Sequence, residues 1–361
     1  MEIKYLTENA ISLLKELIAT QSFSTEETQT ALLIENWFTN HNIPFQRTKN
    51  NVWATNKYFD ESKPTLLLNS HHDTVKPNTA YTKDPFKAII EDGKLYGLGS
   101  NDAGGCLVSL IATFTHFYTQ KDLSYNLVIV ASAEEENSGE NGLNSMLPII
   151  PHIDVAIVGE PTLMQLAVTE KGLVVFDAVV AGTPSHAAHP NTNNSIYNTI
   201  EVLQWFQNFE FKKTSKTLGN VKMTVTQIAA GSQHNVVPAH VNLVVDVRVN
   251  DAYSNQEIAT ILQEESPCTK MTPRSLRLNS SAISTDHELV KSGIAMGRTT
   301  YGSPTLSDQS VLTCQSLKLG PGDSTRSHSA DEFIYLSEIE EGIQLYIELL
   351  NRVLLSKIQP Q

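Results

Sequence analysis

The chain has 361 residues, of which 40% are hydrophobic and 18% are charged, and this composition excludes a mainly disordered protein. The formal charge of −13 argues against nucleic acid as a partner. There is no run of 18 apolar residues and no apolar segment behind a basic start, so we expect no membrane span, no signal peptide and a cytoplasmic protein. The length predicts about two domains.

The first 165 residues alternate helical and strand patterns. Thr7 is expected to cap a first helix, and Ser24 with Glu27 forms a capping-box pattern before a second helix that ends near Asn40. Short apolar runs follow at 66–68, 127–131 and 155–158, with a helical stretch at 106–118 among them. This alternation predicts an α/β domain with a largely buried, mostly parallel sheet.

The pattern changes after residue 166. Valine-rich segments at 173–180, 221–228 and 241–249 read as strands, and the last alternates apolar and polar residues. Helical segments are expected at 196–209 and 255–264. Residues 166–279 therefore predict an inserted α+β domain of the ferredoxin-like type, with an antiparallel sheet and two helices on one side.

From residue 280 the α/β pattern returns. A helix is expected at 308–314, a strand at 317–319 and a long amphipathic helix at 336–356. The prediction is thus one domain made of 1–165 and 280–361, interrupted by a second domain at 166–279.

Histidine and carboxylate residues directly follow the apolar runs of the first domain. His71, His72 and Asp73 come after the first run, three glutamates at 134–136 after the second, and Glu160 after the third. Ligands of open α/β sheets bind at the carboxyl ends of strands. Imidazole and carboxylate together are typical ligands of zinc and related cations. The pattern predicts a metal site on this edge.

Two glycine-rich stretches add further candidates. YGLGSNDAGG at 96–105 contains Asp102, and GPGDSTRSH at 320–328 ends in His328. A phosphate-binding loop is the rival interpretation. It fails because Asp102 occupies the position of the third glycine of a dinucleotide motif and no GK[ST] sequence occurs.

Taken in order, HHD at 71–73, GSNDAGG at 99–105, EEE at 134–136, GEPT at 159–162 and His328 resemble the dinuclear-zinc amidohydrolase and exopeptidase family. That family contains acetylornithine deacetylase, succinyl-diaminopimelate desuccinylase, aminoacylase and the glutamate-releasing carboxypeptidase. The resemblance covers nearly the whole chain and implies that the catalytic domain carries two zinc ions per subunit, which cobalt can replace. It implies these ligands: His71 with Glu160 for one ion, Glu136 with His328 for the other, and Asp102 between both.

The resemblance also assigns the acid–base residues. Asp73 would orient the imidazole of His71, and Glu135 would be the general base. A shift of one residue in the acidic triplet would make Glu134 the base instead. His72 occupies a variable position and is expected not to be a ligand.

The inserted domain would act as a dimerisation and lid domain. GTPSHAAHP at 182–190 resembles the family's lid motif, in which His186 reaches the partner subunit's site and stabilises the oxyanion, so a homodimer is implied. His189 is read as an exposed loop histidine. HNVVP at 234–238 and DVRVN at 246–250 would place Asn235 and Arg248 on the substrate's polar backbone and carboxylate.

The loop at 320–332 indicates the substrate. It looks most like the loop of deacylases of ornithine and citrulline, which favours release of acetate from N-acetyl-L-ornithine in arginine biosynthesis. Asp323 or Asp308 would meet a cationic side chain, and Arg326 an acidic acyl group. N-succinylornithine, N-acetylcitrulline, succinyl-diaminopimelate and dipeptides stay open as substrates. A non-catalytic binding protein is not favoured, because every motif residue is present.

Overall fold

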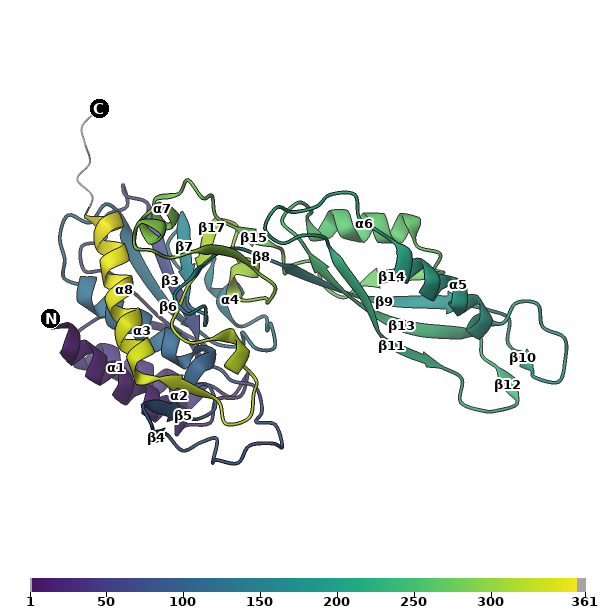
Figure 1. The fold of residues 1–361 in the computed structure, drawn as a ribbon, viewed down its shortest axis with the longest axis horizontal. Helices are drawn as coiled ribbons and strands as arrows, with labels where there is room; N and C mark the ends of the chain where they lie inside the picture. Colours follow the sequence, from purple (N-terminus) through teal and green to yellow (C-terminus); the bar gives the residue numbers. More distant parts are fainter. Residues whose placement is uncertain (1, 356–361) are drawn as a thin grey trace. The chain divides into compact units, whose positions relative to one another are not determined.

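The computed structural model describes residues 2–355, which form two compact units (Figure 1). The first unit contains the described residues up to Val168, Ala282–Tyr301 and the residues from Ser307 on. The second contains Thr169–Ser281 and the short segment Gly302–Leu306. The chain therefore leaves its first unit, forms a second and returns, and residues 302–306 add a short piece to the second unit that the sequence did not indicate.

A nine-stranded sheet organises the first unit, in the order β1-β2-β6-β3-β7-β17-β8-β15, with β16 paired to β8. Strands β6, β3, β7 and β17 are parallel neighbours, whereas β2 is antiparallel to β6. The mostly parallel sheet is thus confirmed. The strands are β1 (Gln46–Thr48), β2 (Asn51–Thr55), β3 (Thr65–His71), β6 (Asn126–Ser132), β7 (Val155–Val158), β8 (Leu166–Glu170), β15 (Ser281–Ala282), β16 (Thr300–Ser303) and β17 (Gln315–Lys318).

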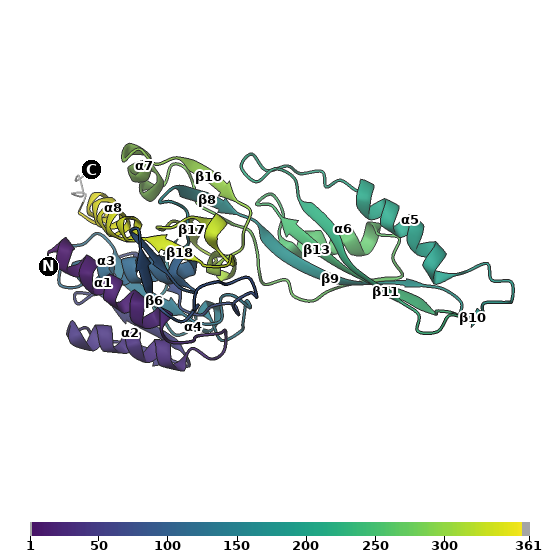
Figure 2. The same cartoon turned by 60° about the horizontal axis from the view of Figure 1, so that its bottom comes forward.

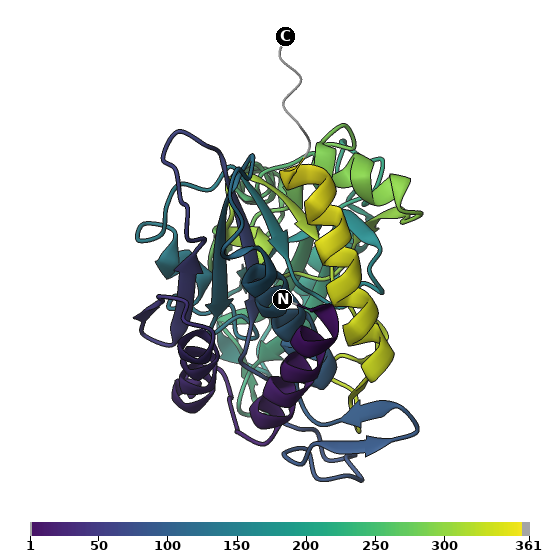
Figure 3. The ribbon, with the colours of Figure 1, turned by 90° about the vertical axis from the view of Figure 1, so that its left-hand side faces the viewer.

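Helices cover this sheet because its central strands are apolar on both faces. Leu66 and Leu68 of β3 pack into the larger core, while Leu67 between them faces a smaller core that includes residues of α4. α1 and α8 both contact α3 (Figure 3). The helices are α1 (Ile3–Ile18), α2 (Thr28–Asn40), α3 (Gly105–Phe117), α4 (Leu143–Met146), α7 (Glu288–Ala295) and α8 (Leu336–Leu354). A separate three-stranded sheet contains β4 (Ile89–Glu91), β5 (Lys94–Tyr96) and β18 (Phe333–Tyr335).

Both expected helix caps at the amino terminus are wrong. α1 begins at Ile3, and Thr7 lies inside it, where its hydroxyl donates to the carbonyl of Ile3. α2 begins at Thr28, and Ser24 donates 2.7 Å to the carboxylate of Asp73 instead of capping the helix. A tertiary hydrogen bond has replaced the local one, which brings Ser24 to the candidate site.

The carboxyl-terminal part also differs in detail from the sequence prediction. The helix expected at 308–314 is a single 3₁₀ turn, η2 (Asp308–Val311), and α7 was not expected at all. Two further short turns carry candidate residues, namely η1 (Ser100–Gly104) and η3 (Ser324–Arg326). The last helix ends at Leu354, and its expected end at residue 356 lies outside the described residues.

The second unit has the order βαββαβ of the ferredoxin-like type, which the sequence predicts, although its last strand was not expected (Figure 2). Its sheet has the order β11-β13-β9-β14 and is antiparallel throughout. Phe176 and Val245 of the sheet share one core with Phe206 of α5 and Leu262 of α6, so both helices cover the same face. The elements are β9 (Gly172–Ala181), β10 (Ser185–His186), α5 (Ser195–Asn208), β11 (Lys222–Ala230), β12 (Val236–Val237), β13 (His240–Val249), α6 (Asn255–Glu265) and β14 (Lys270–Pro273).

Across residues 2–355, none of the helices combines the length and the apolar character that a bilayer crossing requires.

Candidate metal centre

The candidate site lies at the carboxyl ends of three adjacent parallel strands. His71 is the last residue of β3 and is in register with Ser132, the last residue of β6, while Asn69 is in register with Val158 of β7. The residues that directly follow these strands therefore leave the sheet at one edge. Glutamates 134–136 follow β6, and Glu160 follows β7.

Carboxylate oxygens surround the imidazole of His71. Its Nε2 atom lies 3.4 Å from Oδ1 of Asp102, 3.9 Å from Oε2 of Glu135 and 3.8 Å from Oε1 of Glu160. The side chain is only 1% exposed, and Nε2 has no hydrogen-bond partner within the described chain. A buried ring nitrogen without a partner is costly unless a bound group satisfies it.

A second imidazole lies on the other side of Asp102. Nε2 of His328 is 2.9 Å from Oε2 of Glu136 and 3.7 Å from Oδ2 of Asp102. Asp102 thus offers one oxygen to each histidine. The loop that carries Asp102 packs closely against Thr74. Glycine is needed at position 99, because its φ is +74° and a Cβ there would lie only 2.6 Å from Cγ2 of Thr74.

Asp73 makes hydrogen bonds to both His71 and the turn that carries Glu135 and Glu136. Its Oδ1 and Oδ2 accept hydrogen bonds from the backbone N–H groups of Glu135 and Glu136, at 3.0 and 3.1 Å. Its backbone carbonyl lies 3.0 Å from Nδ1 of His71, and Ser24 donates to its Oδ2. Asp73 therefore contacts both the imidazole and the acidic turn, and its orienting role at a metal site remains a prediction.

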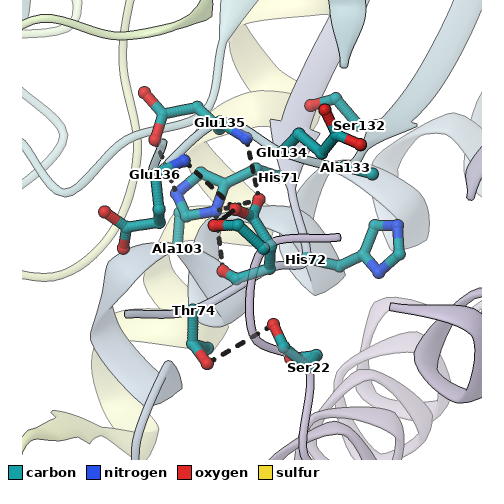
Figure 4. A network of polar contacts seen from close by, with 12 residues as sticks. Ser22, His71, His72, Thr74, Ala103, Ser132, Ala133, Glu134, Glu135 and Glu136 are labelled. Carbon is teal, nitrogen blue, oxygen red and sulfur yellow. Dashed lines mark hydrogen bonds and ion pairs between the residues drawn. The ribbon is translucent and has the colours of Figure 1, made fainter. Parts of the chain in front are cut away.

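Glu134 and His72 point away from this cluster. Figure 4 shows the ring of His72 directed away from His71, Glu135 and Glu136. It lies 2.8 Å from the hydroxyl of Thr30 and 2.9 Å from the carbonyl of Asn50.

The carboxylate of Glu134 is occupied elsewhere, since it accepts hydrogen bonds from the backbone and the side-chain amide of Asn141 at 3.1 and 2.9 Å. Glu135 instead lies beside His71. Of the two glutamates, Glu135 is thus the one that lies in the cluster, and its role as the general base remains a prediction.

The electrostatics of the cluster call for a cation. Burial alone would lower the pKa of His71, but the carboxylates of Asp102 and Asp73 raise this pKa well above its ordinary value. Burial, with the nearby Glu160 charge, raises the pKa of Glu135 well above normal. Crowded carboxylates resist ionisation together, and divalent cations relieve that repulsion. Two groups are close enough to share an ion, His71–Asp102–Glu136 and His71–Glu135–Glu160. This donor set fits zinc or a similar divalent metal.

Two residues of the first unit that are expected to contact the substrate, Arg326 and Asp323, already bind other residues of the chain. The guanidinium of Arg326 binds both carboxylate oxygens of Glu338, at 2.7 and 3.0 Å, and lies 4.7 Å from the ring centre of Phe333. An acyl carboxylate would therefore have to displace Glu338. Asp323 caps η3 by accepting a hydrogen bond from the backbone N–H of Thr325.

Asp308 is buried beside the end of β6. Its carboxylate accepts a 2.6 Å hydrogen bond from the hydroxyl of Ser132 at the end of β6, and burial raises its pKa to about 6. The contact of Asp308 or Asp323 with a cationic side chain remains a prediction, and so does the contact of Arg326 with an acidic acyl group.

Three further candidates belong to the second unit. His186 lies on β10 and is exposed, and the backbone carbonyl of Asn235 accepts a hydrogen bond from Ala187. Arg248 on β13 donates to both carboxylate oxygens of Asp246, at 2.9 and 3.1 Å. Their catalytic and substrate-binding roles remain predictions.

Two residues near the site were missed by sequence reasoning. Ser24 carried the pattern of a helix cap, and nothing in the sequence pointed to its bond with Asp73. Glu332 accepts hydrogen bonds from the backbone around Asp102. Its position four residues after His328 is the one signal that could have drawn attention to it.

The first unit carries imidazoles and carboxylates at one edge of its sheet, and its sequence is interrupted by a ferredoxin-like unit. These features define a candidate metallohydrolase. Residues 67–352 match the model of peptidase family M20/M25/M40, so the chain belongs to this family of amidohydrolases and peptidases.

Named relatives carry two activities. The chain is 28% identical over 384 residues to an acetylornithine deacetylase of Proteus mirabilis, covering 96% of this chain and 97% of that protein. It is 29% identical over 251 residues to a succinyl-diaminopimelate desuccinylase of Rickettsia bellii. That second match spans 64% of each protein.

Solved structures share the fold of the chain. A tripeptidase of Staphylococcus aureus has a TM-score of 0.75 at 19% identity and covers 96% of this chain and 98% of its own. A dinuclear metal binding peptidase of the M20 family from Bacillus subtilis has a TM-score of 0.74 at 15% identity, with coverage of 98% and 99%.

The contrast between Glu134 and Glu135 generates the first prediction. Glu135→Gln should lower kcat by at least the roughly 10²–10⁴-fold typical of a lost general base, while metal content stays as in the wild type. Glu134→Gln is the matched control. It should weaken the hydrogen bonds that the side chain accepts from Asn141 and lower the free energy of unfolding by about 1–3 kcal/mol, while kcat stays near wild type. Steady-state kinetics, metal analysis and thermal unfolding measure these effects. The reverse kinetic pattern would move the base to Glu134.

The second prediction follows from the protonation of His328 in the metal-free protein. The hydrogen bond to Glu136 raises the pKa of His328 to about 9, so the metal-free protein holds this imidazole protonated at pH 7. A ligand imidazole must be neutral, so zinc binding at pH 7 should release protons, and fewer as pH rises through 9. Calorimetry in buffers of different ionisation enthalpy counts these protons, and His328→Gln should reduce the number. Zinc binding with no proton release at pH 7 would contradict the assignment of His328 as a ligand.

Proposed function

We propose that this chain is a metal-dependent hydrolase that releases the acyl group of an N-acyl-L-amino acid, with N-acetyl-L-ornithine as its substrate and L-ornithine for arginine biosynthesis as its product. The observation that carries the hydrolase proposal is the buried Nε2 atom of His71, which makes no hydrogen bond within the described chain and is surrounded by carboxylates. This arrangement is stable with bound cations and unfavourable without them.

Two divalent ions per subunit, zinc with cobalt as a substitute, fit the residues present. His71 and Glu160 would hold one ion, Glu136 and His328 the other, and Asp102 would contact both. Bound there, such ions polarise the scissile carbonyl and lower the pKa of water. Support comes from the proximity of His71 to Glu160 and Asp102 and of His328 to Glu136 and Asp102. Further support comes from the similarity of the fold to a dinuclear metal binding peptidase of Bacillus subtilis.

The chain's own residues would carry the proton and the developing charge. Glu135 takes one proton from the attacking water as the C–O bond forms, and passes it to the amine nitrogen as the C–N bond breaks. Asp73 keeps the imidazole of His71 and the backbone of Glu135 in place during both steps. His186 of the partner subunit donates a hydrogen bond to the oxyanion.

The substrate proposal rests on the extent of similarity as well as on the loop at 320–332. The acetylornithine deacetylase of Proteus mirabilis matches almost end to end, whereas the succinyl-diaminopimelate desuccinylases of two Rickettsia bellii strains match over 64% of their length. N-succinylornithine, N-acetylcitrulline, succinyl-diaminopimelate and dipeptides are the alternatives. They would use the same metals and differ in the groups that meet the acyl and side-chain ends.

We also propose a homodimer formed through the second unit, with Asn235 and Arg248 contacting the substrate. Strand β11 lies at the edge of its sheet, and an exposed edge strand of nine residues favours pairing with another chain. Apolar side chains are exposed on the adjacent helix α5 as well, namely Ile196, Tyr197, Ile200 and Leu203. Such a contiguous apolar surface is typical of a protein interface.

The third prediction tests metal dependence and substrate together. Chelation should abolish hydrolysis, and zinc or cobalt should restore it, because the proposed chemistry needs the ions to polarise the carbonyl. With the metal restored, acetylornithine should give the highest kcat/KM in a panel with succinylornithine, acetylcitrulline, succinyl-diaminopimelate and a dipeptide. Full activity after chelation would refute the metal proposal. A higher kcat/KM for another member of the panel would correct the substrate alone.

The fourth prediction tests the shared site. His186→Ala should bind metals normally and lose roughly 10²–10³-fold in kcat, the usual effect of one lost oxyanion donor. Mixed with Glu135→Gln and allowed to exchange subunits, it should recover roughly a quarter of wild-type activity, because half of the dimers are mixed and each has one intact site. Exchanged mixtures that stay inactive would show that His186 does not act across the dimer.

A further inference from the structure

The two loops that carry Asp102 and His328 are fastened directly to each other. Asp102 lies in η1 and His328 follows η3, so neither of them is placed by the register of the large sheet. Yet Oδ2 of Asp102 and Nε2 of His328 lie 3.7 Å apart. The pairing of Tyr96 in β5 with Phe333 in β18 brings the two loops together at one end. Asp102 and His328 lie several residues beyond that pair, so further contacts must set their distance.

Glu332 makes the main connection. Its Oε1 atom accepts hydrogen bonds from the backbone N–H groups of Asn101 and Asp102 at 2.8 and 2.9 Å, and its Oε2 from that of Gly99 at 3.1 Å. Its backbone carbonyl accepts a further bond from Gly97 at 3.0 Å. The side chain is buried, and the residue is 2% exposed. A carboxylate held by several N–H groups in a buried position is a strong and directional contact.

Asn101 makes the reciprocal connection. Its side-chain amide donates to the carbonyl of Asp323 at 3.0 Å, and its side-chain oxygen accepts from the N–H of Asp323 at 3.0 Å. His328 lies between Asp323 and Glu332 in the sequence, so the loop that carries His328 is attached to the Asp102 loop on both sides of the histidine. Each loop contributes one side chain to the backbone of the other.

We propose that Glu332 is a positioning residue of the metal centre. It holds the backbone of residues 99–102 so that Asp102 turns one oxygen to His71 and the other to His328, and it thereby sets the spacing of the groups that bind the two metal ions. The role rests on the proposed function, since it concerns the affinity of that centre for metal. Residues that orient metal ligands typically contribute 10–100-fold to metal affinity.

The neighbouring residue offers a matched control. Asp331 also accepts hydrogen bonds from a loop, from the backbone of Thr82 and Lys83 at 2.9 and 2.8 Å and from the hydroxyl of Thr82. That loop contains none of the proposed ligands. Asp331→Asn therefore makes the same carboxylate-to-amide change one residue away without touching the Asp102 loop.

The test is a zinc titration of metal-free protein in competition with a chelator of known affinity, with thermal unfolding of the metal-free forms as the check of folding. Glu332→Gln replaces one carboxyl oxygen by an amide N–H₂, so at least one of the three backbone N–H donors loses its acceptor. Zinc affinity should fall by roughly 10–100-fold. Its metal-free form should still unfold cooperatively. Asp331→Asn should keep the wild-type affinity.

Four results would overturn the positioning role. One is a folded Glu332→Gln protein with wild-type zinc affinity, and another is an equal loss of affinity in Asp331→Asn, which would indicate general loosening of the loop. If Glu332→Gln does not fold, Glu332→Asp decides, because it keeps the carboxyl group on a shorter side chain. Weaker zinc binding by this variant supports the role, and wild-type affinity overturns it. A wild-type protein that binds no zinc would instead overturn the proposed function, and the positioning role with it.

Discussion

The arrangement of the first unit depends on one constraint, namely that five carboxylates and two imidazoles share a small volume at the end of the sheet. Asp73, Asp102, Glu135, Glu136 and Glu160 surround His71 and His328. Without cations this set is unfavourable, because buried carboxylates repel one another and Nε2 of His71 has no partner in the described chain. The fold must hold these groups against that repulsion until ions bind.

The sheet supplies most of that rigidity. The parallel strands β6, β3 and β7 are buried on both faces, so the residues that follow them leave a well-packed base. Asp73 then joins two strand ends by accepting hydrogen bonds from the backbone of Glu135 and Glu136 while its own carbonyl meets His71. Groups from separate strands thus become one unit before any metal or substrate arrives, which is what an active site requires of its supporting residues.

The sequence predicts this part of the site well for a physical reason. Buried parallel strands appear as apolar runs, and ligands that directly follow such runs must meet at one edge. The ferredoxin-like unit is equally readable, because the alternation in β13 marks one buried face. Ser24 was misread because its hydroxyl bonds to Asp73, 49 residues away, and no local pattern records such a contact. Glu332 escaped because its partners are backbone N–H groups more than 200 residues distant.

The central claim, that this cluster is a dinuclear metal centre, is tested most directly by anomalous diffraction at the zinc absorption edge on crystals of the zinc-loaded protein. Two anomalous peaks are expected, one against His71 and Glu160 and the other against His328 and Glu136, with Asp102 touching both. Crystals of zinc-loaded protein that show no anomalous peak within this cluster would contradict it.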